Sequence, residues 1–82
     1  PFNPEVNLSF TLENPAENLS LEIYDIQGVL INTLSSGYHK SGTHEFRWNG
    51  NDAHGNAVSS GVYVVRLSEE SVVQIQRMTL LR

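Results

Sequence analysis

The sequence predicts an all-β fold, a seven-stranded antiparallel sandwich, and three features lead to this prediction. Short segments in which apolar and polar residues alternate recur along the chain, as in strands with one buried face. Clusters of Gly, Pro, Asn, Asp and Ser separate these segments at intervals of about 8–12 residues. No segment shows the apolar period of a helix.

The chain begins with an entry segment and a first strand. Residues 1–4 hold two prolines, which fix φ and restrict the preceding residue, so we expect an extended, turn-rich entry. Residues 6–12 alternate as a strand with Val6 and its apolar partners on one face. The turn at 13–18 follows, because Pro15 cannot donate a ladder hydrogen bond.

A hairpin comes next. Residues 19–24 alternate as its first strand, and residues 29–34 return as its second. Asp25 and Gly28 occupy the first and fourth positions of the intervening turn, where these residue types are favoured. Residues 35–43 contain two glycines and are predicted to be a loop.

The second half is arranged around a central loop, residues 49–60, which is rich in Gly, Asn and Asp. These residues tolerate positive φ and satisfy backbone groups locally, so the chain can reverse tightly there. One strand, 44–48, ends at the loop, and another, 62–68, begins after it. Residues 69–71 turn the chain into a last strand at 72–81, which is long enough for a bend or bulge.

This pattern is typical of an immunoglobulin/fibronectin-III-like sandwich, with a small closed barrel as the alternative. The 82 residues are enough for one domain. The start of the chain lacks the features of a signal peptide, although a signal could lie upstream in a longer parent. The longest undiluted apolar run, 62–65, has the length of a strand and is far too short to span a membrane.

Composition excludes several classes of function. The chain has no cysteine, which excludes disulfides, zinc fingers, iron–sulfur clusters and thiol catalysis. The net charge is −4 and the five basic residues are dispersed, which argues against nucleic acid or an anionic membrane surface as a partner.

The aromatic residues have structural and functional interpretations. Trp48 could stack on a sugar, but it ends an alternating strand, which favours burial in the core. The hydroxyl of Tyr63 is expected to tie a loop to the sheet, as in a tyrosine corner. Tyr24 is expected to face outward, where tyrosines often serve contact surfaces.

No catalytic or cofactor site is predicted. Four residues of the central loop could offer oxygens to calcium, but Asp52 is their only carboxylate, so local turn hydrogen bonding is favoured: Asn49, Asn51, Asp52 and Asn56. The three histidines lack Cys or carboxylate partners that would complete a zinc site, and solvated positions are favoured: His39, His44 and His54. The segment 59–61 lacks the strand–Gly-x-Ser-x-Gly–helix setting of a nucleophile elbow.

Six motifs together resemble a bacterial family, and they span nearly the whole chain. They are Pro1-Phe2-Asn3-Pro4, Leu8-Ser9-Phe10-Thr11-Leu12, Ile23-Tyr24-Asp25-Ile26-Gln27-Gly28, Trp48-Asn49-Gly50-Asn51-Asp52 with Gly55, Ser60-Gly61-Val62-Tyr63, and Arg77-Met78-Thr79-Leu80-Leu81-Arg82. Their order resembles the C-terminal sorting domains of cargo of the type IX (Por) secretion system. It also resembles the immunoglobulin-like domain of the flagellar hook-capping protein.

The first resemblance implies a non-catalytic sorting module at the end of a larger multidomain protein. Its partners would be outer-membrane secretion and sortase components and the upstream domains, and the parent would reach the cell surface or exterior through the periplasm. The residues implied are Gly61, Val62 and Tyr63 for the required fold, and Arg77, Met78, Leu80, Leu81 and Arg82 for the signal. The two arginines stand where that family usually has Lys, and Asn49 where it more often has Asp.

This sorting role is the function expected first, and two other functions stay open as alternatives. A structural assembly domain of the hook-capping type would space or contact neighbouring subunits. An accessory carbohydrate-binding module would need two or more coplanar exposed aromatic side chains on one sheet face.

Overall fold

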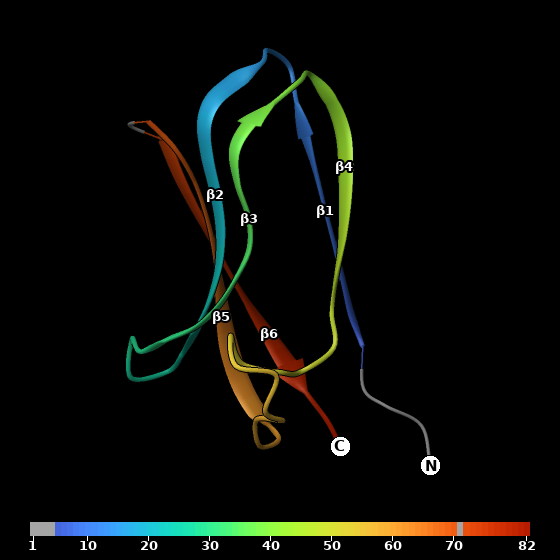
Figure 1. Ribbon diagram of the computed structural model, residues 1–82, viewed down its shortest axis with the longest axis vertical. Helices are drawn as coiled ribbons and strands as arrows, with labels where there is room; N and C mark the ends of the chain where they lie inside the picture. The colour runs from blue at the N-terminus through green and yellow to red at the C-terminus, as the bar shows by residue number, and fades with distance from the viewer. Residues whose placement is uncertain (1–4, 71) are drawn as a thin grey trace.

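The computed structural model describes residues 5–70 and 72–82, which form six β-strands (Figure 1). The predicted entry at 1–4 and the turn residue Ser71 lie outside the described residues. The strands are β1 (Val6–Leu12), β2 (Ala16–Asp25), β3 (Leu30–His39), β4 (Gly42–Trp48), β5 (Gly61–Glu69) and β6 (Val72–Leu80).

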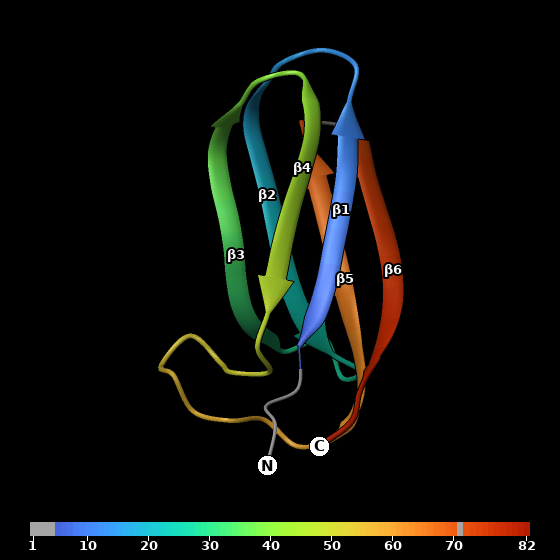
Figure 2. The same cartoon turned by 90° about the vertical axis from the view of Figure 1, so that its right-hand side faces the viewer.

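The strands form two antiparallel sheets that lie face to face (Figure 2). One sheet has the order β3-β2-β5-β6 and the other consists of β1 and β4. The predicted all-β antiparallel fold is therefore confirmed. The predicted number of seven strands is wrong for the described residues, because only β1 and β4 make up the smaller sheet.

The core lies between the sheets and follows the alternation in the sequence. On β2 the odd-numbered residues Leu19, Leu21 and Ile23 are buried, and on β5 Tyr63 and Val65 are buried. Leu80 from β6 and Trp48 from β4 complete the core, and half-buried apolar residues of β1 pack against it. The period-two prediction for these strands is thus confirmed by burial.

The segment 35–43, predicted to be a loop, belongs mostly to strands. β3 runs on to His39, and β4 already begins at Gly42. Pairing with β2 extends β3, since Gly37 lies opposite Leu19 and His39 opposite Ala16. Gly37 has φ of 99°, which fits the irregular pairing of this edge better than a regular strand.

The strand β6 differs from the others because the smaller sheet does not cover it. Its residues from Val72 to Arg77 are all exposed, and only Met78 and Leu80 are covered. Gln74 and Gln76 lie opposite Leu67 and Val65, on the inner face of the sheet, yet they reach water. Among the residues described here, no helix is long or apolar enough to cross a membrane.

Candidate interaction surface

The central loop is closed by Arg82. Its side chain donates from Nη2 to the carbonyl oxygen of Gly50 at 2.6 Å and from Nε to that of Val58 at 2.5 Å. Its backbone N–H donates to Ser60 Oγ at 2.9 Å. The backbone N–H of Val58 also reaches Gly50 O at 2.9 Å, so the two ends of the loop are held by the same carbonyl. Arg82, assigned above to a recognition signal, is thus a structural clamp.

Two turns of the chain have the same hydrogen bonds. Asp25 Oδ1 accepts the backbone N–H groups of Gln27 and Val29, each at 2.9 Å. In the central loop, Asp52 Oδ1 accepts those of His54 and Asn56, also at 2.9 Å. In both turns a glycine three residues after the aspartate has φ of 85°. The same carboxylate geometry thus shapes two distant turns.

Asp52 and Asn49, two of the residues considered as calcium ligands, accept backbone N–H groups of the loop itself with a side-chain oxygen. The N–H of Asn56, followed by that of His54, holds the pKa of Asp52 below its usual value, because both stabilise the charged carboxylate. Asn49 Oδ1 accepts the N–H of Asn51 at 3.2 Å. Local turn bonding, the favoured interpretation, is confirmed for the side chains of Asp52 and Asn49.

Two of the three histidines contact each other, and one of them contacts a serine, which the sequence pattern does not indicate. His39 Nε2 lies 2.6 Å from Ser35 Oγ, and its ring centroid is 5.3 Å from that of His44. His54 is exposed in the central loop. Within residues 5–70 and 72–82, no three His or carboxylate side chains gather as metal ligands.

Trp48 and Tyr63 form the aromatic centre of the core. Their rings meet edge to face at 5.1 Å and 70°. Trp48 Nε1 donates to Asn51 O at 2.8 Å, and the Tyr63 hydroxyl donates to Ser59 O at 2.7 Å. The predicted burial of Trp48 and the predicted loop tie of Tyr63 are both confirmed.

The eight residues assigned to the sorting signal do not form one exposed patch. Tyr63 and Leu80 are buried and Met78 is partly buried. Arg82 is bound to the central loop, and Leu81 beside it is exposed. The remaining three lie on β5 or β6: Gly61, Val62 and Arg77.

The outer face of the four-stranded sheet carries a polar network inside an apolar border. Arg66 Nη1 lies 3.3 Å from Glu22 Oε1, and the Tyr24 hydroxyl donates to the same oxygen at 2.9 Å. This hydrogen bond, together with burial and the charge of Glu22, raises the pKa of Tyr24. Leu30 and Val64 flank Tyr24 in the ladder. Tyr24 thus faces away from the core, as predicted, and is half-buried by these neighbours.

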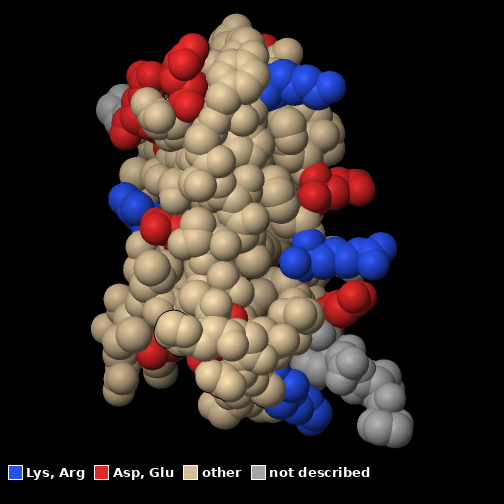
Figure 3. Space-filling view, viewed as in Figure 1, with Lys and Arg blue, Asp and Glu red and all other residues tan. Residues whose placement is uncertain are grey.

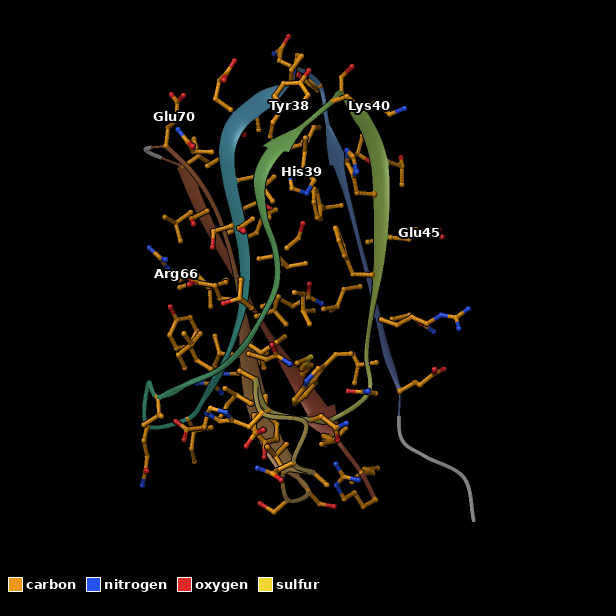
Figure 4. All side chains as sticks on the ribbon, viewed as in Figure 1. Tyr38, His39, Lys40, Glu45, Arg66 and Glu70 are labelled. Carbon is orange, nitrogen blue, oxygen red and sulfur yellow. The ribbon has the colours of Figure 1, made fainter. Side chains whose placement is uncertain are left out.

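The described aromatic residues do not make a sugar platform. Trp48 and Tyr63 are buried, and the half-buried Phe10 and Phe46 pack against the core. Tyr38 is 61% exposed and lies near the β3–β4 turn, as its label in Figure 4 shows, whereas Tyr24 pairs with Leu30 at the opposite end of β3. The two coplanar exposed aromatics that a carbohydrate-binding module needs are not found among the described residues.

The comparisons with known proteins agree on one family. The family model described as "FlgD Ig-like domain" matches residues 3–72. The chain is 32% identical over 57 residues to the "Basal-body rod modification protein FlgD" of Salmonella typhimurium, and equally to that of Salmonella typhi. These matches cover 70% of this chain and 25% of each relative.

A solved structure agrees with the sequence matches. The crystal structure of FlgD from P. aeruginosa aligns with 94% of this chain and 60% of its own length, with a TM-score of 0.65 and 25% identity. The chain thus spans about a quarter of the curated relatives and 60% of the solved one.

These findings correct the first functional expectation. The matching family model describes a domain of a flagellar protein, and the relatives are flagellar proteins. The type IX sorting module expected from the motifs is therefore overturned. Its eight residues keep the structural positions described above, but no recognition role is assigned to them. The second resemblance, to the flagellar protein, is the one supported. Since the family model matches residues 3–72, most of the chain, this protein belongs to the FlgD Ig-like domain family.

Proposed function

We propose that this chain is a non-catalytic assembly domain of a flagellar rod-modification or hook-capping protein, and that its sandwich contacts or spaces neighbouring subunits. The observation that carries the proposal is the family match over residues 3–72. The Salmonella relatives are named for modification of the basal-body rod. The domain would then work in the exported flagellar structure as one part of a larger protein.

The strand order supports the finer assignment to an immunoglobulin/fibronectin-III-like sandwich. The order β3-β2-β5-β6 corresponds to strands C′-C-F-G of that fold, and the pair β1–β4 corresponds to B–E. A scaffold of this kind has its loops at the two ends and its flat faces available for contact.

The outer face described above is the contact surface that we assign to this role. Leu30 is 49% exposed there and borders Tyr24, while the Arg66–Glu22 pair lies in the next row of the ladder. Apolar side chains beside a hydrogen-bonded charge pair suit a protein partner, since interfaces combine buried apolar contacts with polar groups that set orientation.

A chimera tests the proposal. The 57-residue segment of Salmonella typhimurium FlgD that matches this chain would be replaced by the corresponding segment, in a strain that lacks FlgD. We expect partial recovery of swarming and of rod and hook assembly seen by electron microscopy. A chimera that is produced, folded and exported, yet swarms no better than the deletion strain, would refute the proposal.

Matched variants in the same chimera test the surface. Leu30→Asp places a charge on the outer face and should reduce swarming. Val29→Asp is the control, because Val29 is 54% exposed in the adjacent turn and lies outside the sheet. Equal effects of the two substitutions would remove the outer face from the proposal.

A further inference from the structure

The outer strands of the two sheets differ in how well their edges are protected against pairing with another chain. β3 and β4 lie on one side of the molecule, and β1 and β6 lie on the other (Figure 2). The pairing of β3 with β2 shifts register at three places, and β4 carries Glu45 and Arg47. Irregular pairing and charged residues both discourage edge-to-edge association. The side formed by β1 and β6 has regular pairing, and the one charged residue in these two strands is Arg77.

Of β1 and β6, the strand β6 has the edge that is better suited to pairing with another strand. Its first five residues, Val72 to Gln76, contain no charge, proline or glycine and have high β-propensity. Val73 is 44% exposed and Ile75 is 66% exposed, and both lie on the outer face. The exposed residues of β1, by contrast, are polar, since its apolar residues point toward the core. An exposed apolar edge of this kind is a template for another strand.

We propose that β6 pairs in antiparallel fashion with β6 of a second copy of this chain, so that two four-stranded sheets become one continuous sheet. The same edge serves both copies, as in the two-fold interfaces that dominate homodimers. This inference goes beyond the proposed function, because it concerns the isolated chain and holds whether or not the domain acts in a flagellum.

The side-chain pattern limits the register of this pairing. The outer residues Val73 and Ile75 remain on one face of the joined sheet only if outer residues lie opposite outer residues. A register centred on Gln74 meets this condition. It places Val73 of each copy opposite Ile75 of the other, which gathers four exposed apolar side chains into one cluster.

The charges at the two ends of β6 favour the same arrangement. Glu70 precedes the strand at the tip of the β5–β6 turn, where its φ is 50°, and Arg77 lies in the second half of the strand. Acidic side chains gather at this tip in Figure 3, and Figure 4 labels Glu70 there. In a pair centred on Gln74, Glu70 of each copy lies opposite Met78 of the other, one position along the strand from Arg77, so opposite charges come near each other twice.

The pairing also offers hydrogen-bond partners to the glutamines on the inner face of β6. A groove of about 240 Å³ runs between β1 and β6, lined by Asn7 and Ser9 on one side and Gln74 and Gln76 on the other. In the pair of chains, Gln74 faces its own copy across the two-fold axis. Amide side chains can hydrogen-bond to each other in such a ladder, which suits glutamine at an inner but uncovered position.

Analytical ultracentrifugation of the 82-residue chain over a wide concentration range tests the proposal. We expect a concentration-dependent monomer–dimer equilibrium. Ile75→Lys should raise the dissociation constant by about tenfold or more, since it adds a charge to the pairing edge. Ile26→Lys is the matched control, because Ile26 is 74% exposed in the β2–β3 turn, outside the β6 edge, and it should leave the equilibrium unchanged.

A charge exchange tests the orientation. Arg77→Glu and Glu70→Lys should each weaken the dimer, and the double variant should restore it, with circular dichroism confirming the fold of each. A chain that stays monomeric at every concentration would overturn the proposal. Equal weakening of the dimer by Ile26→Lys and Ile75→Lys would also overturn it. If the double variant fails to restore the dimer, the antiparallel register centred on Gln74 is excluded.

Discussion

Gly50 and Arg82 lie so close that a side chain at position 50 would displace the Arg82 guanidinium. A Cβ placed on Gly50 would lie 2.8 Å from Arg82 Nη2, the same nitrogen that donates to the Gly50 carbonyl oxygen at 2.6 Å. Gly50 also has φ of 77°, in the left-handed region. One residue therefore combines an unusual backbone conformation with a close approach to the clamp.

The first prediction concerns this glycine. Gly50→Ala should lower the free energy of unfolding by about 2–3 kcal/mol, since it adds left-handed strain and crowds the clamp. Gly55→Ala is the control, because Gly55 has φ of 85° but nothing lies within 4 Å of its Cβ position. Gly55→Ala should lower the free energy of unfolding only by the left-handed strain, about 1 kcal/mol. Denaturant unfolding measures both, and equal losses would argue against the crowding.

The second prediction concerns the guanidinium. Arg82→Lys keeps the charge but cannot donate to the carbonyls of Gly50 and Val58 from two fixed nitrogens. We expect a loss of about 1 kcal/mol in unfolding free energy and faster hydrogen exchange within the central loop. Leu81→Ala, at a side chain that is 74% exposed, should change neither, and a neutral result for Arg82→Lys would mean that the clamp contributes little.

The third prediction tests the loop tie of Tyr63. Tyr63→Phe removes the donor to Ser59 O but keeps the ring against Trp48. The free energy of unfolding should fall by about 1 kcal/mol, because the Ser59 carbonyl loses its partner. Tyr38→Phe, at an exposed site, should be neutral in the same thermal and denaturant measurements. Equal effects would show that the hydroxyl of Tyr63 has no special role.

The fourth prediction concerns pH. The folded protein holds the pKa of Asp52 below its unfolded value of about 3.9, so Asp52 stabilises the fold above that value and loses this contribution as pH falls through the folded pKa. Asp52→Asn keeps an oxygen acceptor for the turn but removes the titration. The melting temperature of the variant should therefore fall less steeply between about pH 5 and pH 2 than that of the wild type.

A control separates this effect from general loss of charge. Glu13→Gln removes one carboxylate at an exposed residue outside the strands and should leave the slope of melting temperature against pH close to that of the wild type. If Asp52→Asn and wild type have the same slope in acid, the turn does not depend on the ionised carboxylate.

Much of the fold could be predicted from local pattern. The alternation around Leu21 and Ile23 identified a strand with one buried face, and Asp25 with Gly28 identified its turn. The second such turn has the same spacing, Asp52 to Gly55, and could have been found by comparing the two segments. The extension of β3 could not, because Ser35 to Gly37 form strand only through pairing with β2.

The candidate surfaces depended on contacts that no local pattern contains. Arg66 meets Glu22 from a position 44 residues away, and Arg82 reaches Gly50 across 32 residues. The exposure of β6 is likewise a tertiary property. Its apolar residues suggest burial, but the smaller sheet has no strand that covers them. The motif resemblance found the flagellar relative but ranked it second to the type IX sorting family, and the comparisons overturn that ranking.

The pairing of β1 with β4 has a consequence for the order of folding. β2–β3 and β5–β6 are hairpins that close over short turns, whereas Thr11 and Thr43, which share a hydrogen bond across β1–β4, are 32 residues apart. Closing the longer loop costs more chain entropy, so that pair should form after the hairpins in the refolding transition. The β2–β5 pair closes a still longer loop, since Leu19 lies opposite Glu69, so both hairpins are expected to form before either sheet is complete.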